Sequence, residues 1–121
     1  MPEMEIYKTF CFDAAHRLTG VPPTHKCSAM HGHSFEIEVH LRGPVDLKTG
    51  FIMDFGDLSS VCEPVLKKLD HAILNEIEGL ENPTSENMSV WLWNILKPQL
   101  SLLSKIVIKE TGTAGCIYCG E

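Results

Sequence analysis

The strongest chemical signal in this chain is a group of three histidines, His16, His31 and His33. His31 and His33 are separated by one glycine, and on an extended segment such a pair projects from one face because side chains alternate. His16, on a preceding segment, can add a third nitrogen. Three protein ligands leave one coordination position open, which is typical of catalytic zinc. The alternative is that the histidines lie apart and only form hydrogen bonds.

Cys27 lies within the histidine group, and spacing alone leaves two roles open for it. It could be a fourth zinc ligand, which would close the site and make it structural. It could instead be a nucleophile or base, with its thiolate favoured by the metal and by the neighbouring Lys26 and His25. Its expected position in a polar loop argues against an inert, buried thiol.

Asp70 and His71 place a carboxylate next to an imidazole at the expected end of a helix. Such a pair suits proton relay, because both groups can exchange protons with a substrate or with each other. The simpler interpretation is that a charged histidine at the helix C-terminus stabilises the helix dipole.

Glu110 follows Ile106 and Ile108 at the same parity on an expected strand. A carboxylate in line with apolar side chains lies either at the exposed end of the strand or in a ligand pocket, since a buried carboxylate is costly unless it is paired. A cationic or amidine-like ligand edge would supply that pairing. Thr111 and the turn after it could add backbone N–H donors.

The elements that must position these residues follow the predicted order β-β-α-α-β-β. The strands alternate apolar and polar residues, and the helices repeat apolar residues at helical spacing. We expect an α+β fold, in which two amphipathic helices cover one face of an antiparallel sheet and the other face meets solvent or another subunit. The predicted strands are 4–13, 34–42, 103–111 and 116–119, and the predicted helices run from Asp54 to Leu69 and from Thr84 or Ser85 to a stop at Pro98.

Two residues conflict with these patterns, and a third marks the end of a helix. Lys8 falls on the apolar face of the first strand. Pro64 falls inside the first helix, where proline costs about 3 kcal/mol and one hydrogen bond, so a kink or a restart is expected there. Lys97 precedes a proline and should therefore leave the α region, which would end the second helix.

Composition restricts the class of protein. The chain has 121 residues, of which 44% are hydrophobic and 21% charged, which is typical of one globular domain spanning 1–121. A formal net charge of −6 argues against a nucleic-acid partner, and no apolar run is long enough to suggest a membrane span. Five cysteines and no recognisable secretory signal favour a cytoplasmic location. Cys116 and Cys119 resemble half of a zinc or redox motif, and we assign them no function.

Several short motifs, in order and over nearly the whole chain, resemble the 6-pyruvoyl-tetrahydropterin synthase family. The segments 79–84 and 114–118 resemble the bacterial 6-carboxy-tetrahydropterin synthases of queuosine biosynthesis more than the biopterin enzymes. One departure is Cys119, where a basic residue is expected in close relatives. The motifs are Asp13-Ala14-Ala15-His16, Cys27 with His31-Gly32-His33-Ser34-Phe35, Met53-Asp54-Phe55, Leu69-Asp70-His71, Asn82-Pro83-Thr84-Ser85-Glu86 and Lys109-Glu110-Thr111.

The resemblance implies the tunnelling fold, in which a four-stranded antiparallel sheet with two helices on one face assembles into trimers. The trimers would pair as homohexamers, with the sheets joined into a barrel. The resemblance also implies Zn²⁺ as the cofactor and a pterin triphosphate as the small-molecule substrate. The expected reaction is a lyase reaction that converts 7,8-dihydroneopterin triphosphate to 6-carboxy-5,6,7,8-tetrahydropterin and releases acetaldehyde and triphosphate.

The resemblance further implies a role for each candidate residue. The three histidines would hold the zinc, and Cys27 would be a catalytic thiolate rather than a fourth ligand. Asp70 and His71 would form a second proton-relay pair that reaches the zinc of a neighbouring subunit. Glu110 would anchor the guanidine-like edge of the pterin, with Thr111 beside it in the same substrate-binding set.

Two points stay open from the sequence. Arg17 and Lys26, which cluster with His25, are our candidates for binding the triphosphate. Two rival functions also stand beside the expected one. The first is the biopterin enzyme, which would form 6-pyruvoyl-tetrahydropterin. The second is a non-catalytic structural zinc module that uses Cys27 as its fourth ligand.

Overall fold

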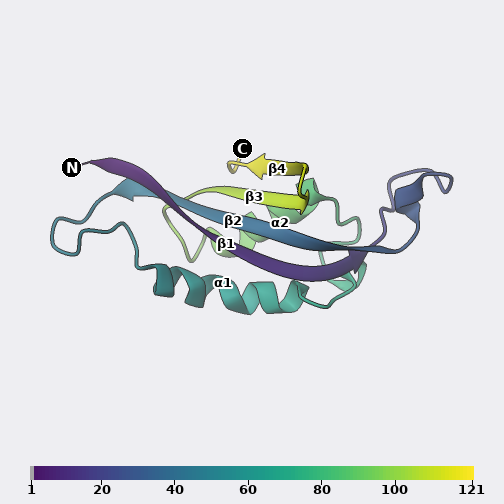
Figure 1. The fold of residues 1–121 in the computed structure, drawn as a ribbon, viewed down its shortest axis with the longest axis horizontal. Coiled ribbons are helices and arrows are strands. Elements are labelled where there is room, and N and C mark those ends of the chain that lie inside the picture. The colour runs from purple at the N-terminus through teal and green to yellow at the C-terminus, as the bar shows by residue number, and fades with distance from the viewer. Residues whose placement is uncertain (1) are drawn as a thin grey trace.

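A four-stranded antiparallel sheet in the order β1-β2-β3-β4 forms the framework of the computed structural model, which describes residues 2–121. Two helices pack against it, α1 mainly on β1 and α2 on β3 and β4 (Figure 1). The predicted element order β-β-α-α-β-β is confirmed. The strands are β1 (Glu3–His16), β2 (His31–Pro44), β3 (Leu103–Thr111) and β4 (Ala114–Tyr118), the helices are α1 (Phe55–Leu69) and α2 (Ser85–Leu96), and the 3₁₀ turns are η1 (Lys26–Ser28) and η2 (Leu74–Glu76).

β1 and β2 form a hairpin that is longer than the sequence pattern predicted. The pairing runs from Glu3 opposite Pro44 to His16 opposite His31, whereas the predicted strands were 4–13 and 34–42. The apolar alternation stops before the histidines, but the backbone ladder continues through them. The extension carries all three histidines into the sheet.

One face of the sheet holds the core. Phe12 on β1, Phe35 on β2 and Ile108 on β3 are buried there beneath the two helices. Lys8, the exception to the apolar pattern, has its ammonium group satisfied by a hydrogen bond to the Ser59 hydroxyl of α1. The predicted single covered face is therefore confirmed, and Lys8 fits it because a polar partner lies within its reach.

Helix α1 begins where the sequence predicted. The side chain of Asp54 caps the helix by accepting a hydrogen bond from the Asp57 N–H at 3.0 Å. The helix does not restart at Pro64 and continues to Leu69. Pro64 and Ser60 are both exposed, so the Ser60 carbonyl that loses its usual partner can bind water, while the opposite side of the helix stays packed on the sheet.

Helix α2 is capped by Thr84, whose hydroxyl accepts a hydrogen bond from the Asn87 N–H at 3.0 Å. The expectation that Lys97 leaves the α region is wrong, because its φ and ψ are −56° and −42° and its N–H still bonds to the Trp93 carbonyl. The last strand begins at Ala114, two residues before the predicted start. Within residues 2–121, neither helix combines the length and the apolar character that crossing a bilayer requires.

Candidate metal centre

The β1–β2 hairpin brings the three predicted histidines together at one end of the buried face. His16 stands opposite His31 in the ladder, and His33 stands opposite Ala14. The ring centroid of His16 lies 4.6 Å from that of His31 and 5.2 Å from that of His33. His16 is fully buried, and the other two rings are half-buried. Strand register alone therefore explains why residues far apart in sequence form one cluster.

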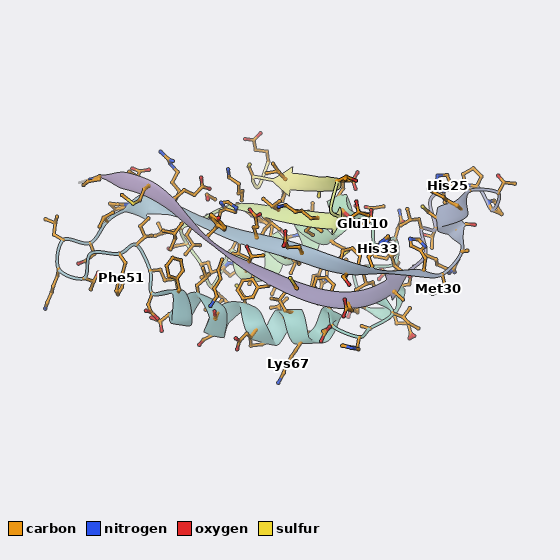
Figure 2. The ribbon with its side chains drawn as sticks, in the orientation of Figure 1. His25, Met30, His33, Phe51, Lys67 and Glu110 are labelled. Atoms are coloured by element: carbon orange, nitrogen blue, oxygen red, sulfur yellow. The ribbon has the colours of Figure 1, made fainter. Side chains whose placement is uncertain are left out.

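Glu110 of β3 joins the same cluster. Its Oε1 atom lies 3.3 Å from Nε2 of His16 and 3.2 Å from Nε2 of His33. One ligand atom from each of His16, His31, His33 and Glu110 lies within 4.8 Å of all the others. Figure 2 shows His33 and Glu110 side by side, at the end of the molecule near His25 and opposite the end that carries Phe51.

Sequence reasoning left Glu110 either at the exposed end of its strand or in a ligand pocket, and it missed the approach of Glu110 to the histidines. The signal was available in part, because Glu110 shares its parity with Ile108, and Ile108 pairs with Ile37 on the strand that carries the histidines. The missing information was the register between β2 and β3, which a single sequence does not specify at this end of the sheet.

A β-bulge in β3 aims the Glu110 side chain. Lys109 pairs with Gly115 and Thr111 pairs with Ala114, so Glu110 is the extra residue between two ladder positions. Gly115 permits this arrangement, because a Cβ atom there would lie 2.6 Å from the Ile108 carbonyl oxygen. The close approach of β4 therefore helps to hold the bulge.

Backbone carbonyls fix the orientation of two of the rings. Nδ1 of His16 donates to the Pro83 carbonyl at 2.8 Å, and Nδ1 of His31 donates to the Ala29 carbonyl at 2.8 Å. A carbonyl only accepts, so each Nδ1 carries the proton and each neutral ring presents the lone pair of Nε2. Burial is the main cause that lowers the pKa of His16 below its ordinary value, which favours this neutral form.

The donor set fits a divalent metal ion. Nε2 of His16 and Nε2 of His33 are buried, and neither has a hydrogen-bond partner within residues 2–121. Leaving such atoms unpaired is costly, and a cation held between them and the carboxylate of Glu110 would satisfy them. Imidazole nitrogens combined with a carboxylate oxygen suit zinc among the common metals.

Cys27 lies outside this four-residue cluster. It sits in η1, half-buried and unpaired, with its N–H bonded to Nδ1 of His25 at 3.0 Å and its carbonyl accepting from the Leu18 N–H at 2.8 Å. Within the described chain, its sulfur is not among the atoms that gather around the metal position. The four side chains that could share a metal ion in this structure therefore do not include Cys27.

Asp70 and His71 form the predicted pair, with Nδ1 of His71 at 3.0 Å from Oδ2 of Asp70. Asp13 of β1 clamps both: its N–H donates to Oδ1 of Asp70 at 3.0 Å, and its carbonyl accepts from the His71 N–H at 2.6 Å. The Asp13 N–H, followed by His71, lowers the pKa of Asp70. His71 has φ of 56°, an uncommon left-handed conformation that these bonds hold in place.

The Asp70–His71 pair does not reach the metal cluster of its own chain. The His71 side chain is 78% exposed, and among residues 2–121 no hydrogen bond or ion pair joins it to the clustered histidines. It lines an open cavity of about 510 Å³ along the edge strand β1, which residues 13–15, 32–34 and 71–73 enclose. The Asp70–His71 pair is therefore accessible from outside the chain at this edge of the sheet.

The remaining candidates lie on the surface. Arg17, Lys26 and Thr111 are exposed and do not belong to the metal cluster. Sequence reasoning missed Asn75, whose side chain accepts from the Arg17 N–H at 3.0 Å and donates to the Arg17 carbonyl at 2.8 Å. No sequence motif marks Asn75, since its partner lies on a distant loop. Its bonds fix the chain as it leaves β1, directly after His16.

Cys116 and Cys119 lie outside the metal cluster. Cys116 is half-buried with its sulfur 3.1 Å from the Ser89 hydroxyl oxygen, and Cys119 is exposed. Both are unpaired, and neither contributes to the metal cluster found within residues 2–121.

Comparison with known proteins gives a consistent result. The family model described as 6-pyruvoyl tetrahydropterin synthase matches residues 5–121. A Synechocystis protein named 6-carboxy-5,6,7,8-tetrahydropterin synthase is 38% identical, with 93% of this chain and 91% of that protein covered. A Haemophilus influenzae protein of the same name is 33% identical over 94% of this chain and 97% of its own. The solved structure of the Caenorhabditis elegans 6-pyruvoyl tetrahydropterin synthase is 31% identical, with a TM-score of 0.92 over 100% of this chain and 98% of that one.

These matches extend beyond the metal centre to the whole framework. The sheet, the two helices and their order are those of the tunnelling fold that the motifs predicted. The family model covers residues 5–121, and the structural match covers 100% of the chain. The chain belongs to the 6-pyruvoyl tetrahydropterin synthase family.

Proposed function

We propose that the chain is a zinc-dependent lyase that converts 7,8-dihydroneopterin triphosphate to 6-carboxy-5,6,7,8-tetrahydropterin, acetaldehyde and triphosphate. The carrying observation is the convergence of three imidazole Nε2 atoms at the end of the buried face, two of them with their tautomer fixed by a backbone carbonyl. The names of the Synechocystis and Haemophilus relatives favour the carboxy product, and the queuosine pathway is the proposed context.

The metal, when bound, supplies Lewis acidity that makes the C–H and O–H groups of the substrate side chain easier to deprotonate. His16, His31 and His33 would hold it. Cys27, on the short turn η1, would remove and return a proton as its thiolate. Its position outside the ligand cluster supports this role over that of a structural ligand.

Glu110 would recognise the substrate ring, and Asp70 with His71 would relay protons. A carboxylate at the end of the apolar face can accept two N–H groups from the guanidine-like edge of a pterin. Thr111 would add to this subsite. Arg17 and Lys26 are exposed on the loop side of the cluster and would contact the triphosphate.

The proposed enzyme acts as a homohexamer of two trimers in the cytoplasm. Two observations support an assembly: the His71 side chain is largely exposed and forms its ion pair with Asp70, and β1 is an edge strand with an open cavity beside it, lined by both His71 and His33. A neighbouring subunit at this edge would receive the pair. The five unpaired cysteines suit a reducing compartment.

A product assay tests the proposed function. Purified, zinc-loaded protein is incubated with 7,8-dihydroneopterin triphosphate, and the products are identified by mass spectrometry together with an assay for acetaldehyde. Formation of 6-carboxy-5,6,7,8-tetrahydropterin with acetaldehyde supports the proposal. Formation of 6-pyruvoyl-tetrahydropterin without acetaldehyde identifies the biopterin reaction instead.

A further inference from the structure

The position of Glu110 carries an inference beyond ring recognition. We propose that Glu110 is a fourth ligand of the metal in the substrate-free protein, so that substrate must displace it. This inference rests on the proposed function for the presence of the metal. It gives Glu110 a second role, in addition to anchoring the pterin ring.

The distances match a shared metal ion. Zinc binds imidazole nitrogen and carboxylate oxygen at about 2.0–2.2 Å, so two ligands of a tetrahedral site stand roughly 3.4 Å apart. Oε1 of Glu110 lies 3.3 Å from Nε2 of His16 and 3.2 Å from Nε2 of His33. The carboxylate therefore stands at the separation that a common tetrahedral ion requires from two of the histidines at once.

Hydrogen bonding does not account for the same contacts. The Nδ1 proton of His16 is committed to the Pro83 carbonyl, so the neutral ring turns a lone pair toward the carboxylate. Nε2 of His16 and Nε2 of His33 have no hydrogen-bond partner within the described residues, although Glu110 is the nearby acceptor for both. The Nε2 lone pair of His16 and a carboxylate at this distance repel each other unless a cation lies between them.

The backbone around Glu110 holds the carboxylate in this position. The bulge between Lys109 and Thr111 directs the side chain toward the histidines, and β4 supports the bulge at Gly115. The Glu110 side chain is 32% exposed, so part of it is accessible from solvent. A ligand held firmly from the backbone yet open on one side is suited to exchange.

The consequence is a site that is closed at rest. Four protein ligands would fill a tetrahedral zinc site, and departure of Glu110 would open a position for the substrate side chain. The departing carboxylate becomes free to accept the N–H groups of the ring edge. Dissociation of Glu110 from the metal and recognition of the substrate ring would thus be linked through one residue.

Metal binding by the full-length protein without substrate tests the inference. The metal-free wild type, Glu110→Gln and Glu36→Gln are titrated with Zn²⁺ against a chromophoric chelator. Glu36 is the matched control, because it pairs with Lys109 on the opposite face of the same sheet. We expect Glu110→Gln to weaken Zn²⁺ binding at least tenfold and Glu36→Gln to change it less than twofold. Equal affinity of Glu110→Gln and wild type would overturn the inference.

The absorption spectrum of bound Co²⁺ gives a second readout, which uses a different variant and reports directly on the ligands of the metal. We expect Glu110→Ala to alter the visible bands relative to the wild type, and added acetate to restore them by supplying the missing carboxylate. A Co²⁺ spectrum of Glu110→Ala identical to that of the wild type would overturn the inference. Neither measurement uses substrate. A negative result would therefore overturn the role of Glu110 as a ligand and would not affect the proposed function, which the acetaldehyde assay tests separately.

Discussion

His16 and His31 face each other across the β1–β2 ladder, with ring centroids 4.6 Å apart and each Nδ1 bonded to a backbone carbonyl. The pairing of β1 with β2 brings these two histidines together, so no separate loop rearrangement is needed to form the pair. The metal centre is therefore as rigid as the two strands that carry it. Sites on regular elements hold their geometry better than sites on loops.

The first prediction concerns the metal ligands. His31→Ala should lose stoichiometric zinc, because only two imidazoles would remain at the site, while the half-buried position limits the loss of stability. His40→Ala is the control, since His40 lies on the opposite face of the same strand and bonds to Glu38. Metal content after dialysis measures the outcome. Equal zinc content in the two variants would place the metal elsewhere.

The second prediction separates the enzyme from a structural zinc module. Cys27→Ala should retain zinc and a wild-type melting temperature and should lower turnover by roughly 10²- to 10⁴-fold, the usual cost of removing a general acid–base group. Cys119→Ala, at an exposed cysteine outside the metal cluster, should leave all three unchanged. Loss of zinc together with unfolding of Cys27→Ala would instead favour the structural module.

The third prediction concerns the bulge that aims Glu110. Gly115→Ala should destabilise the fold by about 1–3 kcal/mol, because the new Cβ would lie 2.6 Å from the Ile108 carbonyl oxygen. β4 must shift to relieve the clash, so zinc affinity should fall as well. Gly112→Ala is the matched control, since a Cβ there meets no atom within 4 Å. Urea unfolding and zinc titration measure both effects, and equal behaviour of the two variants would contradict the role of Gly115.

The sequence predicts most of the fold and part of the site, and the difference has a physical origin. The caps at Asp54 and Thr84 and the element order follow from local rules, and all of them are confirmed. The ends of the β1–β2 hairpin do not, because hydrogen bonds between strands continue after the apolar alternation has ended. A pattern of side chains reports burial, whereas a ladder also forms where side chains are polar.

Long-range contacts set the limit within the site. The three histidines were predictable as a group, since two of them share one strand. The approach of Glu110 depends on the β2–β3 register and on a bulge, neither of which leaves a distinctive sequence signal. The clamp of Asp13 on Asp70 and the bond from Asn75 to the Arg17 backbone are likewise contacts between distant segments.

The fourth prediction is a pH dependence on the open face of the sheet. The pKa of Glu38 is lowered, first by the hydrogen bond from His40 at 2.8 Å and then by Lys109. A carboxyl with a lowered folded pKa contributes stability that is fully present above its ordinary value of 4.5 and is lost as pH falls through the folded pKa.

Glu38→Gln should therefore cost up to about 1 kcal/mol at neutral pH and progressively less below pH 4.5. Glu78→Gln, at an exposed carboxylate that forms no ion pair among residues 2–121, should show no such convergence with the wild type. Melting temperatures of the three proteins measured from neutral to acidic pH give the comparison. A constant difference between wild type and Glu38→Gln at all pH values would contradict the assigned cause.

The fifth prediction tests whether neighbouring subunits complete each site. Cys27→Ala and His71→Ala should each be inactive, because one lacks the thiolate and the other lacks the relay imidazole. The His71 side chain is 78% exposed and is not part of its own metal cluster within the described residues, which supports the proposal that the two groups meet across a subunit boundary. Random reassembly of the two variants would then restore roughly a quarter of the sites, each taking an intact Cys27 from one subunit and an intact His71 from another. Activity is measured after the mixture is dissociated and reassembled, with each variant treated alone as the control. If both groups acted within one chain, no subunit in the mixture would carry an intact pair, and the mixture would stay as inactive as its components.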